Sequence, residues 1–128
     1  TKIGGTGSHI KWHAESDKIS SKKAQQGISP NFVHSLDAAA LTKSVIRAHQ
    51  EGIYDFAMIH DSYGTHANNC DVFSRVLREE YFSLFSVDLL QDFLRQVSIQ
   101  HPNIEFPEIP AYGNADLTEV LKSTYFFS

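Results

Sequence analysis

The chain contains 128 residues, of which 41% are hydrophobic and 12% aromatic, and it carries a net charge of −4 at pH 7. These values are typical of one ordinary globular domain and exclude a low-complexity chain. No apolar run approaches the roughly 18 residues that a membrane span needs, so no membrane partner is expected. The chain begins at Thr1 and has Met58 as its sole methionine. We therefore expect a fragment or a processed piece of a longer protein.

Charge is distributed unevenly along the chain. Residues 1–50 carry seven Lys or Arg against three Asp or Glu, a net charge of +4. Residues 51–128 carry four against twelve, a net charge of −8. A basic amino-terminal part suits a polyanionic partner such as nucleic acid, although a local excess of this size is also common on surfaces that bind nothing.

The first predicted elements are a loop and a long helix. Residues 1–25 are rich in glycine and polar residues and lack apolar periodicity, which predicts a loop or a connection from an upstream region. A helix is expected over about residues 30–51. Ser29 can cap its first turn, Pro30 fits that turn, and Gly52 can end the helix.

Residues 53–66 predict a β-hairpin. Residues 53–59 are short, apolar and rich in strand formers, residues 60–64 are of the turn type, and residues 63–66 can return as a second strand. This arrangement places His60 and Asp61 at or near the tip of the hairpin.

Three further helices are predicted, over residues 70–85, 87–98 and about 116–122. Prolines mark an irregular connection between the last two, and the aromatic end of the chain is expected to dock on a larger body. The predicted fold class is therefore α+β and mostly helical, with one β-hairpin.

Asp61 is the first candidate for chemistry. A carboxylate that follows an apolar strand on a tight turn is exposed enough to bind a hard cation such as Mg²⁺. Alternatively, Asp61 stabilises its own turn through local hydrogen bonds. His60 points to the opposite strand face, where it either supports a metal site or bonds a backbone group. A two-metal site needs a second carboxylate, and the pattern of residues reveals none.

His34 is the second candidate. It lies three residues before Asp37 on the predicted helix, near a small polar face that contains Asn31 and Ser35. The other histidines form no set with metal-ligand spacing. His34 therefore donates a hydrogen bond either to a core carbonyl or to a ligand along the polar face, and the two alternatives are equally favoured.

Three segments resemble single-subunit RNA polymerases, the type found in T-odd bacteriophages and in mitochondria. Residues 26–38 (QGISPNFVHSLDA) resemble a segment characteristic of that family, and residues 56–66 (FAMIHDSYGTH) resemble its palm hairpin. Residues 110–114 (PAYGN) and the aromatic end of the chain resemble the family's extreme carboxyl terminus. The order and spacing of the three motifs make the resemblance specific over residues 26–128.

The resemblance implies a DNA-directed RNA polymerase with a right-hand shape, of which residues 26–128 are the carboxyl-terminal part of the catalytic domain. Its partners would be a DNA template, an RNA product, nucleoside triphosphates and the rest of the polymerase chain. Asp61 would be a catalytic ligand of Mg²⁺ in a two-metal mechanism, with His60 beside it. His34, Asn31 and Ser35 would face the nucleic acid. The second catalytic aspartate and the nucleotide-handling residues would lie outside this chain, which alone is expected to be inactive.

Two other functions and two origins stay open at this stage. A metal-dependent phosphohydrolase could use His60 and Asp61 as a dyad with His34 and His49, although such dyads usually lie on helices. A piece that only binds nucleic acid is the other alternative. The short connection after residue 97 favours a phage enzyme in the cytoplasm of an infected bacterium, with the mitochondrial matrix as the alternative location.

Overall fold

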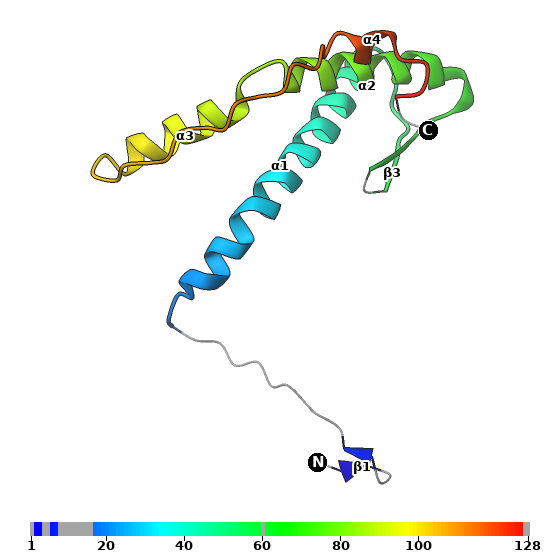
Figure 1. Cartoon of the computed structure of the whole chain (residues 1–128). Coiled ribbons are helices and arrows are strands. Elements are labelled where there is room, and N and C mark those ends of the chain that lie inside the picture. Colours follow the sequence, from blue (N-terminus) through cyan, green and yellow to red (C-terminus); the bar gives the residue numbers. More distant parts are fainter. Residues whose placement is uncertain (1, 4–5, 8–16, 60, 127–128) are drawn as a thin grey trace. The chain divides into compact units, whose positions relative to one another are not determined.

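The computed structural model describes residues 2–3, 6–7, 17–59 and 61–126, and Figure 1 shows their elements in chain order. The chain divides into two compact units, residues 1–34 and 35–128. In the first unit two short strands, β1 (Lys2–Ile3) and β2 (Thr6–Gly7), pair antiparallel. The expectation of an irregular segment over residues 1–25 was therefore wrong in part, because the pairing of backbone groups makes a small sheet there.

Helix α1 (Ser21–Gln50) begins nine residues before the predicted start. Ser20 precedes it, and its Oγ accepts a hydrogen bond from the backbone N–H of Lys23 at 3.4 Å, as a residue at the N-cap position does. Residues 22–26 are Lys, Lys, Ala, Gln and Gln, all strong helix formers. The first turns are exposed to solvent, so capping and propensity form them without an apolar face.

Pro30 consequently lies inside α1 and not in its first turn. A proline in a helix interior removes one backbone hydrogen bond and disfavours the helical conformation of the residue before it. Because of these costs, the sequence predicts that the helix begins at Pro30, with Ser29 as its cap. The structure shows that the helix formers ahead of Pro30 continue the helix through it.

The end of α1 agrees with the prediction at Gly52. Gly52 has φ of +92°, a conformation that favours glycine. The N–H of Ile53 donates to the carbonyl of Ala48 at 3.0 Å, and the N–H of Gly52 donates to the carbonyl of His49 at 3.1 Å. This pair of bonds is the Schellman motif, and the accompanying contact joins Ile53 to Ala48 in the buried core.

The predicted hairpin is present, with shorter strands than expected. Strands β3 (Ala57–Ile59) and β4 (Ser62–Gly64) pair antiparallel, with Ala57 opposite Gly64 and Ile59 opposite Ser62. A Cβ on Gly64 would lie 3.3 Å from the Cβ and carbonyl oxygen of Ala57, so the strands approach closely there. At the open end of the hairpin, the Thr65 hydroxyl donates to the carbonyl of Asp55 at 2.9 Å.

Helix α2 (Cys70–Phe85) has the predicted bounds and follows a 3₁₀ turn, η1 (Ala67–Asn69). Helix α3 (Leu89–Gln100) begins two residues later than predicted, because Asp88 caps it by accepting a hydrogen bond from the N–H of Gln91 at 2.9 Å. Helix α4 (Glu119–Lys122) is shorter than expected. Asp116, its predicted start, instead accepts hydrogen bonds from the N–H and hydroxyl of Thr118.

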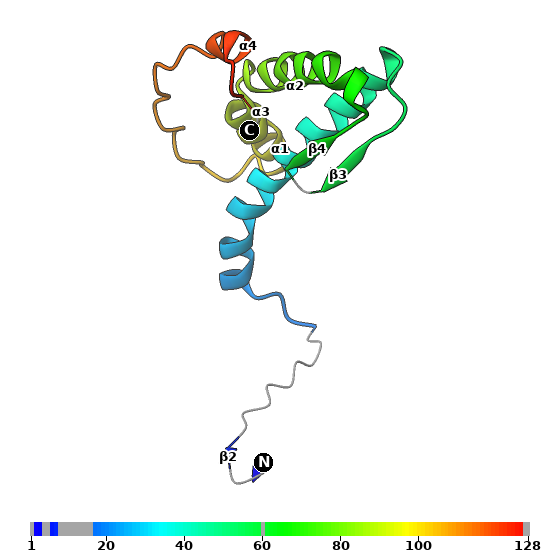
Figure 2. The same ribbon diagram turned by 90° about the vertical axis from the view of Figure 1, so that its right-hand side faces the viewer.

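The core of the second unit lies where the end of α1, the hairpin and α2 meet, as the two views in Figures 1 and 2 show. Partly buried residues of the hairpin pack against this core. The core itself is formed by five buried side chains: Ala48, Ile53, Phe73, Val76 and Leu77. Helix α4 packs against α2. The described residues are thus mostly helical with two small antiparallel sheets, which confirms the α+β class. Among them, no helix is both long and apolar enough to cross a membrane.

Candidate functional site

Asp61 lies at the turn of the hairpin, between β3 and β4, and its side chain is exposed. The short apolar, strand-forming run before it and the turn residues after it put the carboxylate at the tip, as the sequence predicts. His60, the other residue predicted for this turn, lies outside the described residues. The structure therefore presents the exposed carboxylate of Asp61 at the turn of a short, hydrogen-bonded hairpin.

An open pocket with a volume of about 490 Å³ lies between the inner side of the hairpin and the start of α2. The hairpin contributes residues 61–65 to its lining, and α2 contributes four further residues: Cys70, Phe73, Ser74 and Leu77. Phe73 and Leu77 belong to the buried core, so the pocket borders directly on that core. Asp61 is the acidic group among the lining residues.

Tyr63 connects this pocket to the core. Its ring packs edge to face on Phe73, with 6.2 Å between the ring centres. Burial raises the pKa of the Tyr63 phenol, and the negative charges of Asp37 and Asp61 raise it further. Asp37 of α1 and Asp61 of the hairpin therefore lie within electrostatic reach of the same phenol.

The position of Asp37 was missed by the sequence-based interpretation, which placed it inside a helix with no relation to Asp61. A signal was present. Asp37 lies three residues before Ala40, which begins the buried row of small residues continued by Ser44 and Ala48. Residues three and four apart share a helix face, so Asp37 lies on the face of α1 that is buried further along.

The described residues fit a metal site only in part. Among residues 17–59 and 61–126, no three His, Cys, Asp or Glu side chains gather as a metal-binding group. Asp61 has the ligand type and exposure that Mg²⁺ requires, and it can supply one carboxylate. Asp55 is unsuitable, because it lies at the open end of the hairpin, 3.4 Å from Nε2 of His66.

The residues predicted to face nucleic acid all lie on α1. Asn31, His34 and Ser35 are exposed, and their spacing of three and four places them on one side of the helix. His34, for which bonding to a core carbonyl and contact with a ligand were both predicted, is exposed on α1. Asp37, two residues beyond Ser35, is also exposed.

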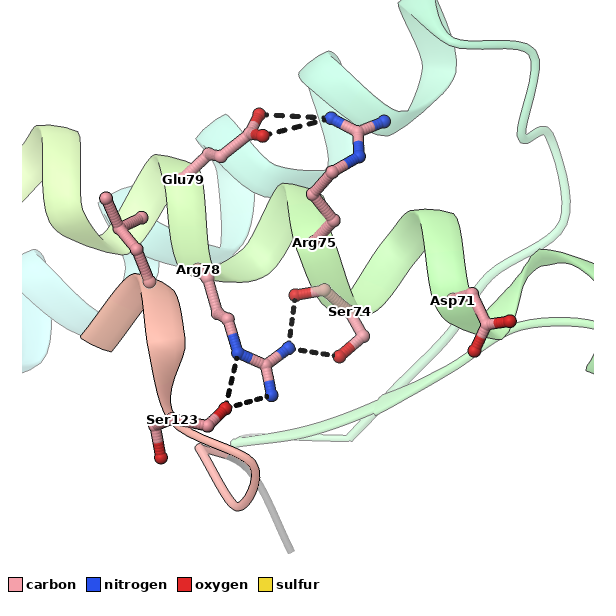
Figure 3. Close-up of a pocket in the computed structure, with 7 residues that line it drawn as sticks. Asp71, Ser74, Arg75, Arg78, Glu79 and Ser123 are labelled. Atoms are coloured by element: carbon pink, nitrogen blue, oxygen red, sulfur yellow. Dashed lines mark hydrogen bonds and ion pairs between the residues drawn. The ribbon is translucent and has the colours of Figure 1, made fainter. Parts of the chain in front are cut away.

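A second pocket, of about 520 Å³, was not foreseen from the sequence. It lies between α2 and the segment that follows α4, and Figure 3 shows the side chains that line it. Arg75 pairs with Glu79 at its edge, whereas Arg78 reaches across to the backbone of Ser123. Ser74 lines both this pocket and the one that contains Asp61.

Comparison with known proteins shows the class to which this chain belongs. The family model for DNA-dependent RNA polymerase matches residues 6–103, which include α1, the hairpin, α2 and α3. The match covers most of the chain, so the chain belongs to the family of single-subunit DNA-dependent RNA polymerases. The family resemblance of the motifs around His34 and Asp61 is thereby confirmed.

Three plant proteins illustrate the relationship. The chain is 39% identical over 114 residues to DNA-directed RNA polymerase 1A of Nicotiana tabacum, which covers 89% of this chain and 73% of that protein. It is equally similar to the mitochondrial DNA-directed RNA polymerase 1 and the chloroplastic DNA-directed RNA polymerase 3 of Nicotiana sylvestris. The 114 matched residues span 11% and 12% of those two proteins. These names agree with the mitochondrial alternative for the location and give no support to a phage-infected bacterium.

Proposed function

We propose that this chain is the part of a DNA-directed RNA polymerase that carries one catalytic carboxylate. The reaction is the transfer of a nucleotide from a nucleoside triphosphate to the 3′ end of an RNA, directed by a DNA template. The observation that carries the proposal is the family match, which spans the hairpin with Asp61 and the α1 motif with His34. The similarity to proteins named as DNA-directed RNA polymerases supports it.

Asp61 is proposed as a ligand of catalytic Mg²⁺ on the palm hairpin. When bound, Mg²⁺ would make the 3′-hydroxyl of the RNA a better nucleophile and neutralise charge on the triphosphate. The hairpin serves this role because β3 and β4 fix the turn on which Asp61 lies, and Tyr63 anchors it to Phe73. His60, which precedes Asp61 in the sequence, is proposed to support it.

The exposed residues Asn31, His34 and Ser35 of α1 are proposed to contact the nucleic acid. Their side chains offer hydrogen bonds without a negative charge, which suits the phosphates and sugars of a duplex. The basic excess of residues 1–50 points to the same partner, since lysines and arginines attract a polyanion from a distance.

The remaining ligands of the metal and the residues that bind the triphosphate are proposed to belong to other parts of the polymerase chain. This follows from the described residues, which bring no third metal-ligating side chain to Asp61. Residues 26–128 are thus proposed as part of a larger catalytic domain. By the names of the relatives, the proposed location is a mitochondrion or a chloroplast.

Asp61 is tested in a full-length polymerase that carries this segment. In the Asp61→Ala variant, template-dependent RNA synthesis should fall by about 10³-fold or more, because several kcal/mol of charge stabilisation in the transition state is lost. Binding of template DNA, measured by gel shift, should stay within about twofold, since the contacts on α1 remain.

Asp55→Ala provides the matched control, because it removes an exposed carboxylate from the same hairpin but outside the pocket. Its synthesis rate should remain close to that of the unmodified enzyme. A normal rate in the Asp61→Ala variant would disprove the proposed role of Asp61. A normal rate together with hydrolysis of phosphate esters by the unmodified protein would favour the phosphohydrolase.

A further inference from the structure

The side chain of Arg78 on α2 binds the segment that follows α4. Its Nε and Nη2 donate to the carbonyl oxygen of Ser123 at 3.1 and 2.9 Å, and Nη2 also donates to the carbonyl of Thr124 at 3.5 Å. Its guanidinium carbon lies 5.9 Å from the centre of the Phe126 ring. Arg78 therefore contacts three of the last four residues that the structure describes.

The other side of the same guanidinium is fixed within α2. Nη1 of Arg78 donates to the backbone carbonyl of Ser74 at 3.0 Å and also to its hydroxyl. Figure 3 shows the fork spanning the gap between Ser74 and Ser123. A planar fork with several donors can hold two groups at once, which a lysine ammonium at the end of a flexible stem does less well.

Aromatic contacts complete the attachment. The Phe126 ring packs edge to face on Tyr81, with 4.9 Å between the ring centres, and Tyr81 in turn packs on Phe85. Tyr81 and Arg78 are three residues apart and thus lie on one face of α2. Phe126 is partly buried there, whereas its neighbour Tyr125 is 82% exposed.

We propose that Arg78 is a positioning residue that fixes segment 123–126 on α2. Through Ser74, it also holds that segment in a constant position relative to the pocket that contains Asp61. Ser74 lines both pockets, so a change in the position of this residue alters the wall of each. The effect on RNA synthesis rests on the proposed function, whereas the attachment of the segment does not.

The attachment is tested by hydrogen–deuterium exchange in a full-length polymerase that carries this segment. In the Arg78→Ala variant, amides of residues 119–126 should exchange about tenfold faster, because the hydrogen bonds from a charged donor that hold segment 123–126 on α2 are lost. Arg78→Lys should give most of this increase, since it keeps the charge and loses the fork. Amides of residues 61–65 should also exchange faster in both variants.

Arg75→Ala is the matched control. It removes a guanidinium from the same helix. The partners of this guanidinium are Glu51 and Glu79, and not the segment after α4. It should leave exchange in residues 119–126 unchanged. Unchanged exchange there in both Arg78 variants, or faster exchange there without any change in residues 61–65, would overturn the proposal.

RNA synthesis separates this inference from the proposed function. The Arg78→Lys variant, which preserves the charge and fold of α2, should lower kcat while the KM for nucleoside triphosphates changes little, because the residue positions the site and does not bind the nucleotide. If Asp61→Ala also retains full synthesis, the proposed function fails. If the Arg78 variants retain full synthesis and Asp61→Ala does not, the proposed link between Arg78 and the pocket that contains Asp61 fails.

Discussion

Two side chains of the hairpin, Asp61 and Tyr63, show how local chemistry is set by neighbours. Asp61 is exposed at the turn, and Tyr63 is partly buried two residues later. The pKa of Tyr63 is raised first by burial and then by the charges of Asp37 and Asp61. The phenol thus reports on both carboxylates, which the sequence alone does not bring together.

This residue-scale arrangement predicts the effect of removing either charge. Asp61→Asn and Asp37→Asn should each lower the pKa of Tyr63 toward its ordinary value of 10.0, because a neighbouring negative charge disfavours the phenolate. The measurement is an NMR titration of the Tyr63 ring carbon that bears the hydroxyl.

Asp88→Asn is the control for that titration. The hydroxyl of Tyr112 donates to Asp88 at 2.6 Å, and this bond raises the pKa of Tyr112. The variant should lower the pKa of Tyr112 and leave that of Tyr63 unchanged. A Tyr63 titration that neither the Asp37 nor the Asp61 variant alters would contradict the placement of α1 beside the hairpin.

At the scale of elements, the junction between α1 and the hairpin determines where Asp61 lies. The Schellman motif at Gly52 reverses the chain and buries Ile53 against Ala48. Four residues later β3 begins, already packed on α2 through Phe56 and Phe73, whose ring centres are 5.5 Å apart. The chain reversal at the end of α1 and the packing of Phe56 on Phe73 therefore determine the position of the turn that carries Asp61.

Replacing Gly52 should weaken this junction. Nothing lies within 4 Å of a Cβ built on Gly52, so Gly52→Ala causes no clash, but φ of +92° is unfavourable for any residue with a side chain. We expect the free energy of unfolding to fall by about 1 kcal/mol, measured by urea denaturation.

Gly113→Ala separates backbone strain from the general effect of an added methyl group. A Cβ at Gly113 also meets nothing within 4 Å, and its φ is not in the positive region. The free energy of unfolding of the Gly113→Ala variant should be unchanged or slightly increased, because alanine restricts the unfolded chain. Equal stability of the two variants would show that the conformation of Gly52 contributes nothing.

On the scale of the whole second unit, ion pairs connect the end of α1 to α2. Glu51 pairs with Arg47 on α1 at 3.0 Å and with Arg75 on α2. Lys43, eight residues before Glu51 on α1, pairs with Glu80, five residues after Arg75 on α2, at 3.4 Å. Beside these pairs, Ala48 of α1 is buried in one core with Phe73 and Val76 of α2.

The pKa of Glu51 is lowered from its ordinary value of 4.5, mainly by hydrogen bonds from Arg75 and then Arg47. A carboxylate whose pKa is lower in the folded state stabilises the fold above the unfolded pKa, and this contribution is lost as the pH falls through the folded pKa. Glu51→Gln should therefore lower Tm at pH 7 and reduce the loss of Tm between pH 5 and pH 3, measured by thermal unfolding.

Glu105→Gln serves as the reference, since it removes the same charge from the irregular connection between α3 and α4. Its Tm should follow the unmodified chain at every pH. Asp92 and Asp116 also have lowered pKa values, so part of the acid sensitivity should remain in the Glu51 variant. An unchanged pH dependence in Glu51→Gln would exclude this ion pair as a stabilising contact.

Local patterns in the sequence predicted the elements that rest on local physics. Gly52 ends α1 because a left-handed backbone favours glycine, and the apolar stripe of residues 72–77 forms the buried face of α2. The hairpin and its exposed Asp61 follow from the apolar, strand-forming run of residues 53–59 and the turn residues after it. The start of α1 was missed, since an exposed helix without an apolar face gives no periodic signal.

Sequence alone thus determined the family, the class of fold and the residue proposed for catalysis, because the motifs around His34 and Asp61 are short and local. The tertiary structure decided which distant residues meet: Asp37 near Tyr63, Glu51 on Arg75, and Arg78 on Ser123 and Phe126. Such contacts depend on how helices pack and on where an irregular connection returns. No periodicity within one segment records either of these, so only the folded chain reveals them.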